Sequence, residues 1–165
     1  MYKRIFEIEN KLDEGMFLFG ARQTGKSTLL KERFKDAVYY DLLNPNVRKA
    51  FKRNPNILWE ALQDKPTGTL VIVDEIQKVP ELLDVVHSLM VERGLSFILS
   101  GSSSRKLKRS GANTLGGRAI PETLYPLVWP EVTDFQIDRA VQNGMIPRHY
   151  MVEDATKRLS GYVKV

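Results

Sequence analysis

Cysteine is absent from the 165 residues of this chain. Its absence excludes disulfide bonds and thiolate-ligated metal sites, and it is typical of proteins in a reducing compartment. Only two histidines are present, His87 and His149, and their separation argues against a histidine metal site. No apolar run reaches membrane-spanning length, and acidic residues interrupt the N-terminus before any signal-peptide core. We therefore expect a cytoplasmic protein.

The chain has only a small excess of positive charge. Lysine and arginine number 25 and aspartate and glutamate 20, which gives a formal net charge of +5 at pH 7. With 42% hydrophobic and 27% charged residues, one soluble globular domain is expected. Basic residues gather in the short clusters "LKERFK", "VRKAFKR" and "SRKLKR". A nucleic-acid surface and solvated helix faces both produce such clusters, and we favour the second interpretation.

Short apolar segments alternate with segments of helical spacing. Strands are predicted over residues 16–20, 37–43, 69–76, 95–102 and 122–127. The third and fourth have continuous apolar cores, as expected for strands covered on both faces. Residues 80–94 predict a helix whose apolar face comprises Leu82, Val85, Val86, Leu89 and Met90, and residues 54–63 predict a shorter helix. This alternation indicates an α/β fold, a parallel sheet between two helical layers. Residues 109–117 are rich in glycine and small polar residues, which predicts a mobile loop.

The segment "GARQTGKST" follows the first predicted strand and precedes a predicted helix. Gly20, Gly25, Lys26 and Ser27 match the P-loop or Walker A pattern G-x-x-x-x-G-K-[ST]. Its glycines let backbone N–H groups point at phosphate oxygens, and the helix N-terminus adds a positive dipole end. The alternative is a glycine-rich turn with an incidental lysine. The predicted nucleotide-binding segment consists of Gly20, Ala21, Arg22, Gln23, Thr24, Gly25, Lys26, Ser27 and Thr28.

Two residues of this loop receive specific roles, whereas Arg22 and Gln23 receive none. Lys26 is expected to reach the β- and γ-phosphates of ATP. Ser27 is expected to supply a hydroxyl ligand to Mg²⁺. The expected cofactors are therefore ATP or ADP together with Mg²⁺.

A second motif follows the third predicted strand. The strand in "TLVIVDEIQ" ends in Asp74 and Glu75, at the strand end where open α/β sheets bind ligands. Asp74 is predicted to hold Mg²⁺ as a Walker B aspartate, and Glu75 to polarise a water for attack on the γ-phosphate. The alternative interpretation is an acidic pair that caps the following helix.

Several separated blocks resemble one protein family. "GARQTGKSTLLKE", "VYYDLL", "LVIVDEIQKVPELL", "FILSGSSSRKL", "LGGRA" and "LYPLVWPE" follow the order seen in AAA domain family fourteen, prokaryotic ATPase domains of the AAA+ superfamily. The resemblance implies a P-loop fold of the additional-strand catalytic-glutamate type, with strand order 5-1-4-3-2. It also implies that Ser100 is a sensor near the γ-phosphate and that Arg118 is an arginine finger. The alternatives are a turn-forming Ser100 and a solvated loop Arg118.

The resemblance ends near residue 131. We expect residues 1–131 to form the ATPase core, and residues 132–165 to be a C-terminal extension that begins a truncated further domain. Proteins that this chain resembles continue into a C-terminal domain, and AAA+ ATPases usually add a helical lid. The sequence leaves little room for either, so residues 145–165 are expected to pack poorly and turnover to be slow.

Two hypotheses about function follow. The favoured one is an Mg²⁺-dependent ATPase that acts as a motor or switch for a further domain. The other is a regulatory module that binds nucleotide and hydrolyses it slowly or not at all. A small-molecule phosphotransferase is disfavoured, because the sequence has no acceptor-site insertion. The expected partners are nucleotide and further copies of the chain, with nucleic acid left open and no membrane.

Overall fold

The computed structural model describes residues 2–8, 15–102, 107 and 115–163. In this part of the chain, one sheet of parallel strands has the order β2-β3-β4-β1-β5. Its strands are β1 (Gly15–Phe19), β2 (Val38–Asp41), β3 (Leu70–Asp74), β4 (Ser96–Gly101) and β5 (Ala119–Thr123). This is the predicted order 5-1-4-3-2 counted from the opposite edge, so the predicted fold class is confirmed.

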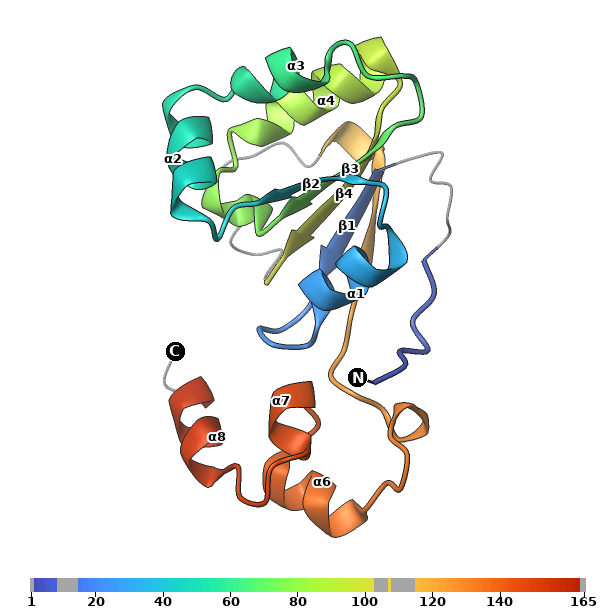
Figure 1. Cartoon of the computed structure of the whole chain (residues 1–165), viewed down its shortest axis with the longest axis vertical. Helices are drawn as coiled ribbons and strands as arrows, with labels where there is room; N and C mark the ends of the chain where they lie inside the picture. The colour runs from blue at the N-terminus through green and yellow to red at the C-terminus, as the bar shows by residue number, and fades with distance from the viewer. Residues whose placement is uncertain (1, 9–14, 103–106, 108–114, 164–165) are drawn as a thin grey trace.

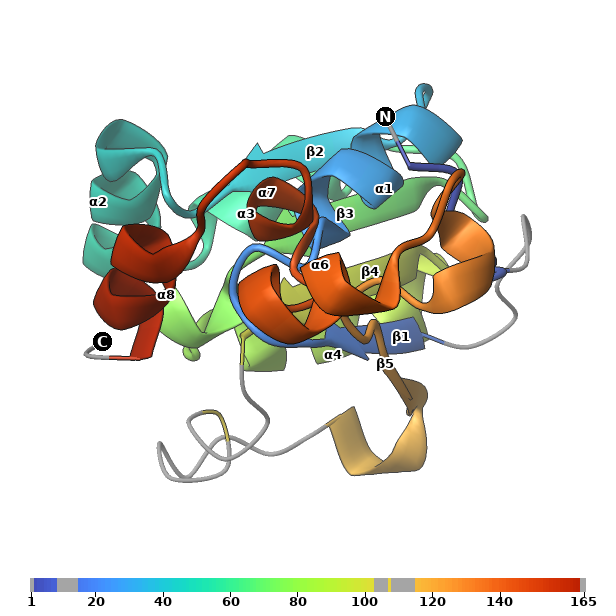
Figure 2. The same cartoon turned by 90° about the horizontal axis from the view of Figure 1, so that it is seen from below.

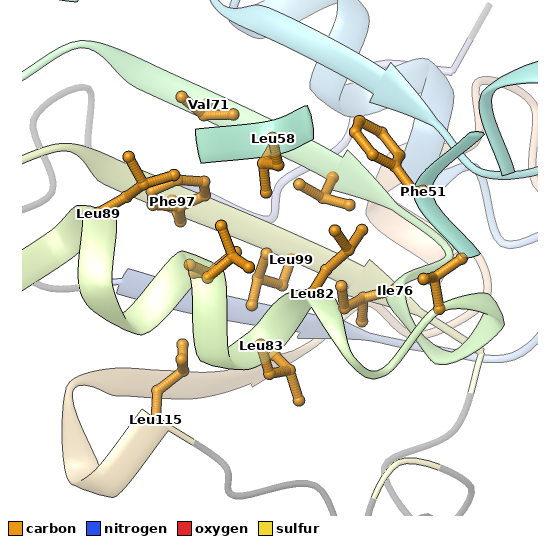
Figure 3. Close-up of a cluster of buried hydrophobic side chains, with 14 of the residues drawn as sticks. Phe51, Leu58, Val71, Ile76, Leu82, Leu83, Leu89, Phe97, Leu99 and Leu115 are labelled. Carbon is orange, nitrogen blue, oxygen red and sulfur yellow. The ribbon is translucent and has the colours of Figure 1, made fainter. Parts of the chain in front are cut away.

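Helices cover both faces of the sheet (Figure 1). One face packs against α2 (Pro45–Arg53), α3 (Ile57–Leu62) and α4 (Leu82–Arg93), whose buried residues include Leu58, Leu82 and Leu89. Figure 3 shows this cluster around the β4 residues Phe97 and Leu99. The other face packs against α1 (Lys26–Arg33), whose Leu30 is buried there.

Alternate residues of the central strands point to opposite layers. Val73 and Leu99 face the larger cluster, whereas Ile72 and Ile98 join Leu30 of α1 in the smaller one. All five side chains are fully buried. A strand that is apolar on both faces is expected in a parallel sheet between two helical layers. The continuous apolar runs in the sequence have this cause.

Strand β5 begins three residues earlier than predicted, at Ala119 in place of residue 122. The prediction of residues 122–127 was therefore wrong in its bounds. Pro121 is accepted within this strand because β5 lies at the edge of the sheet, where one side of the backbone needs no partner. The ladder ends soon after Thr123, with a hydrogen bond from the Leu124 N–H to the Phe19 carbonyl at 2.8 Å. Pro126 lacks an N–H and cannot extend it.

Two of the basic clusters lie on helices. "VRKAFKR" forms most of α2, which buries only Phe51 and is capped by the Asn44 side chain accepting from the Asn46 N–H at 3.0 Å. "LKERFK" spans the end of α1, where Lys31 and Arg33 are exposed. Both clusters therefore lie on exposed helix faces, an arrangement that either interpretation requires. Except for Leu107, the third cluster lies outside the described residues.

Three helices follow the sheet: α6 (Ile137–Asn143), α7 (Pro147–Tyr150) and α8 (Thr156–Val163). They lie beyond the P-loop end of the sheet, as Figures 1 and 2 both show. Ile146, Tyr150 and Ala155 are buried, so the prediction that residues 145–165 pack poorly was wrong for residues 145–155. Helix α8 buries none of its residues, as that prediction expects. These helices were not predicted from the sequence, because they are short and bury few side chains.

The described part of the chain also contains three single-turn 3-10 helices: η1 (Ile76–Lys78), η2 (Leu115–Gly117) and η3 (Trp129–Glu131). Most of the predicted mobile loop, residues 109–114, lies outside the described part of the chain. Within that described part, no helix combines the length and the apolar composition needed to cross a membrane.

Candidate functional site

The P-loop connects the end of β1 to the start of α1. Gly25 immediately precedes the helix with φ 96°, a left-handed conformation that glycine adopts without strain. Gly20 is required for a different reason: a Cβ there would lie 2.3 Å from the Leu124 carbonyl oxygen. The backbone therefore requires glycine at both positions, at Gly25 for its conformation and at Gly20 for lack of space.

Lys26 is the first residue of α1 and turns back over the loop. Its Nζ donates to the carbonyl oxygens of Gly20 at 2.7 Å and Ala21 at 3.0 Å. Burial lowers the pKa of Lys26, while the carboxylates of Glu75 and Asp74 act in the opposite direction. The ammonium group therefore lies in a poorly hydrated site near two negative charges. A lysine so placed is no incidental loop residue, which argues against the glycine-turn alternative.

Asp74 ends β3 and is 1% exposed. Its Oδ1 accepts a hydrogen bond from the Ser100 hydroxyl, and its Oδ2 accepts one from the Tyr39 hydroxyl at 2.6 Å. Ser100 lies inside β4 and is itself buried, so it is not a turn-forming serine. Each oxygen of this buried carboxylate therefore has a hydrogen-bond donor, as buried polar groups require.

Glu75 precedes η1 with φ 61°, a left-handed conformation that is uncommon for a residue with a side chain. Its side chain makes no capping bond to η1, so the helix-capping alternative is wrong for Glu75. Its carboxylate instead accepts a hydrogen bond from Gln77 Nε2, which also donates to the Ser102 hydroxyl at 3.2 Å. The two adjacent carboxylates thus have different hydrogen-bond partners.

Tyr39 is a residue of this site that the sequence analysis missed. Burial, followed by the hydrogen bond to Asp74, raises the pKa of Tyr39 far above its usual value. The phenol therefore stays protonated and donates. The Ser27 side chain also lies beside the Tyr39 hydroxyl. Tyr39 could have been placed near Asp74 beforehand from the pairing of β2 with β3 in the sheet.

Comparison with known proteins supplies the family. A model described as an AAA domain, the fourteenth family of that name, matches residues 13–133. The chain belongs to the AAA domain family. This result confirms the resemblance seen in the sequence, and together with the P-loop it supports nucleotide binding by this AAA domain. A search of the curated proteins finds no match.

Two solved structures are similar to this AAA domain. A variant of RuvB from Thermotoga maritima has 12% sequence identity and a TM-score of 0.49, covering 68% of this chain and 37% of its own. The Aeropyrum pernix ORC1 protein, solved in complex with DNA, has 18% identity and a TM-score of 0.48, covering 78% of this chain and 44% of its own. The AAA domain thus spans less than half the length of either structure.

The donor groups of the AAA domain fit a magnesium ion. Ser27 and Asp74 both lie beside the Tyr39 hydroxyl, which brings two hard oxygen ligands to one place. Among the described residues, no group of three or more His, Cys, Asp or Glu side chains could hold a metal by itself. Magnesium usually keeps several waters and takes further ligands from substrate phosphates, so one carboxylate and one hydroxyl suffice.

Arg118 lies at the opposite end of the sheet from the P-loop. The first residue pair of the β1–β5 ladder is Gly15 with Ala119, whereas the P-loop follows the last pair. At 3.3 Å per residue the five-residue ladder separates them by about 13 Å. The exposed Arg118 guanidinium has Nη1 3.5 Å from Nε2 of His87. This geometry keeps Arg118 from its own P-loop.

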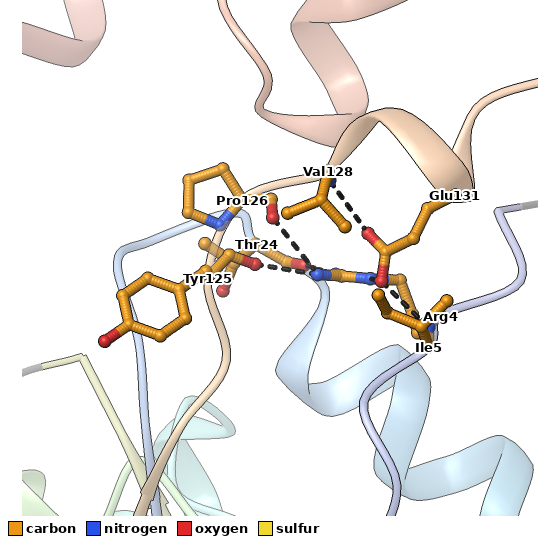
Figure 4. Close-up of polar contacts among 7 residues, drawn as sticks. All are labelled: Arg4, Ile5, Thr24, Tyr125, Pro126, Val128 and Glu131. Atoms are coloured by element: carbon orange, nitrogen blue, oxygen red, sulfur yellow. Dashed lines mark hydrogen bonds and ion pairs between the residues drawn. The ribbon is translucent and has the colours of Figure 1, made fainter.

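A buried ion pair fastens the N-terminal segment to the P-loop, as Figure 4 shows. Arg4 Nε donates to Glu131 Oε1 at 3.0 Å, and Arg4 Nη1 donates to the Thr24 carbonyl at 2.6 Å. The backbone N–H groups of Ile5 and Val128 donate to the same carboxylate, at 2.9 and 3.1 Å. The sequence analysis missed this pair, because 127 positions separate its members.

The C-terminal helices contact the P-loop of the AAA domain. The Tyr162 hydroxyl of α8 donates to the Arg22 carbonyl at 3.2 Å. A cavity of about 420 Å³ lies between them, with arginines from both sides, and its lining consists of Arg22, Gln23, Arg148, His149, Arg158, Gly161 and Tyr162. The last 34 residues thus reach the predicted nucleotide-binding segment.

Proposed function

We propose that this AAA domain binds ATP with Mg²⁺ and hydrolyses it. The carrying observation is the convergence of three charged groups at the carboxyl edge of the sheet. Lys26 starts the helix after the P-loop, Asp74 ends β3, and Glu75 follows Asp74. Both carboxylates raise the pKa of Lys26 against the effect of burial. Open α/β sheets bind ligands at this edge.

Lys26 would bind phosphate in the proposed site. In the structure its ammonium group binds the carbonyls of Gly20 and Ala21, which are neutral acceptors. Phosphate oxygens carry full charge and bind an ammonium group more strongly than carbonyls do. Lys26 would therefore leave the loop carbonyls for the β- and γ-phosphates, while the loop N–H groups bind the same phosphates.

The carboxylates have separate roles in the proposal. Asp74 and the Ser27 hydroxyl would hold Mg²⁺, which neutralises charge on the phosphates when bound. Glu75, whose carboxylate has a different partner from that of Asp74, would accept a proton from the attacking water. Ser100, held on Asp74, is proposed as the sensor residue near the γ-phosphate.

A second candidate function is a nucleotide-binding module that hydrolyses slowly. The hydrogen bond from Gln77 to Glu75 favours it, since a carboxylate held by this donor has to leave it before it can bind the attacking water. We also propose that residues 132–165 begin a further domain that the ATPase moves. The chain would act as a homo-oligomer, with or without nucleic acid.

Phosphate release tests the proposal. The purified protein is incubated with ATP in Mg²⁺ and in EDTA, and nucleotide binding is measured in parallel by calorimetry. Release in Mg²⁺ alone supports the ATPase. Binding without release would select the slow module, and the absence of binding would overturn both.

A further inference from the structure

The Tyr39 hydroxyl occupies a place between two predicted metal ligands. It lies 2.6 Å from Asp74 Oδ2 and beside the Ser27 side chain. A cation shared by Ser27 and Asp74 would have to lie near both of them as well. The Tyr39 hydroxyl and a cation at this place would therefore compete for Asp74 Oδ2.

The aromatic ring of Tyr39 is held independently of its hydroxyl. It packs against the smaller hydrophobic cluster, and Lys31 Nζ lies 4.8 Å from the ring centroid. Tyr39 pairs with Ile72 in the β2–β3 register, and Asp74 lies two residues further along the same face of β3. Removing the hydroxyl alone should leave the ring in place.

We propose that Tyr39 is a positioning residue whose hydroxyl stands in for Mg²⁺ on Asp74 and is displaced from it when the metal binds. The inference rests on the proposed function and deepens it. Without a cation, a buried carboxylate needs hydrogen-bond donors, and Tyr39 and Ser100 supply one to each oxygen. On this proposal, a cation that binds Asp74 on the side of Tyr39 replaces the Tyr39 hydrogen bond.

Competition of this kind has an unusual consequence. Tyr39→Phe removes a competitor for Asp74, so the variant should bind Mg²⁺ more tightly than the parent chain. A hydrogen bond to a charged group is worth enough to change the affinity about tenfold. The metal-free variant should unfold at a lower temperature, because Asp74 has lost a donor there. Saturating Mg²⁺ and ADP should close this gap.

Tyr40→Phe is the matched control. Tyr40 is the next residue of β2, pairs with Val73 and packs its ring edge-on against Phe51 at 5.3 Å on the opposite face. The Tyr40→Phe substitution also removes one phenol oxygen from β2, but it leaves the hydrogen bonds of Asp74 in place. The experiment measures the Mg²⁺ concentration that half-restores ADP affinity, by calorimetry, and thermal unfolding in EDTA and in Mg²⁺ with ADP.

The outcomes separate this inference from the proposed function. If the parent chain shows no Mg²⁺ effect on ADP binding, the proposed function fails and this inference fails with it. If the parent shows the effect and Tyr39→Phe requires as much Mg²⁺ or more, the inference alone is overturned. A second measurement adds Asp74→Ala, which removes the acceptor of the Tyr39 hydroxyl. In that background Tyr39→Phe should no longer lower the metal-free unfolding temperature, and an undiminished loss would show that the hydroxyl does not act through Asp74.

Discussion

Arg4 and Glu131 form an ion pair that is almost completely buried, with 9% and 1% of their side chains exposed. The pair joins the start of the described chain to the segment after β5. Arg4 also donates to the backbone carbonyls of Thr24 and Tyr125, at 2.6 and 2.7 Å. One guanidinium group therefore connects the N-terminal segment, the P-loop and the path into the C-terminal helices.

The first prediction concerns this pair. Glu131→Gln should lower the free energy of unfolding by about 3 kcal/mol, because it leaves the Arg4 charge buried without its partner. Glu122→Gln is the control, since Glu122 lies in edge strand β5 and no salt bridge to it is seen among the described residues. Urea unfolding measures both. Equal stability of the two variants would show that the pair contributes little beyond the neutral hydrogen bonds.

The second prediction concerns Lys26. Lys26→Ala should weaken ATP binding strongly and leave the fold intact, because the ammonium group is the positive charge directed at the phosphates in a poorly hydrated site. Lys35→Ala, which removes an exposed lysine just after the same helix, should bind ATP as the parent does. Calorimetry gives both affinities. A folded Lys26→Ala chain with unchanged affinity would rule out the P-loop assignment.

The third prediction separates binding from chemistry. Glu75→Gln keeps the size of the side chain but removes its basicity, so ATP should still bind while phosphate release falls by about 10²- to 10⁴-fold. Glu81→Gln changes an exposed glutamate just before α4 and should leave release unchanged. Turnover in Glu75→Gln equal to that of the parent would remove Glu75 from the catalytic role.

Local patterns allowed much of this fold to be predicted. The P-loop, the third and fourth strands and helix α4 each have a signal within a few neighbouring residues, and each is present in the structure. The donors around the carboxylates could not be predicted in this way. Tyr39 contacts Asp74 across 35 positions, and Arg4 contacts Glu131 across 127. The first contact depends on the register between β2 and β3, and the second on the path of the chain after β5. Local patterns specify neither of these.

The fourth prediction distinguishes the two candidate functions. Gln77→Ala removes the donor that binds the Glu75 carboxylate, so the carboxylate is free to turn to the attacking water and phosphate release should rise several-fold. ATP affinity should stay the same, because Gln77 is not part of the P-loop. Gln63→Ala is the control, since Gln63 follows α3 and its side chain accepts only from Trp59 among the described residues. A fall in release would mean that Gln77 holds Glu75 in its productive direction.

The fifth prediction is that Arg118 acts on the site of a neighbouring subunit. Arg118 lies at the amino end of β5, too far from its own P-loop to reach it, and its guanidinium group is exposed. An arginine supplied to the γ-phosphate is worth about 10³- to 10⁵-fold in rate in other P-loop enzymes. Arg118→Ala and Lys26→Ala chains should therefore each be inactive alone.

Mixing the two variants provides the decisive measurement. A Lys26→Ala subunit retains Arg118 and can present it to the intact P-loop of an Arg118→Ala neighbour, so phosphate release should be partly restored. Arg93→Ala, an exposed arginine at the end of α4, replaces Arg118→Ala in the control and should be active without mixing. Mass photometry shows whether mixed oligomers form. If they form and release no more phosphate than either variant alone, Arg118 is a solvated arginine beside His87, because a guanidinium group that serves the adjacent site must restore activity there.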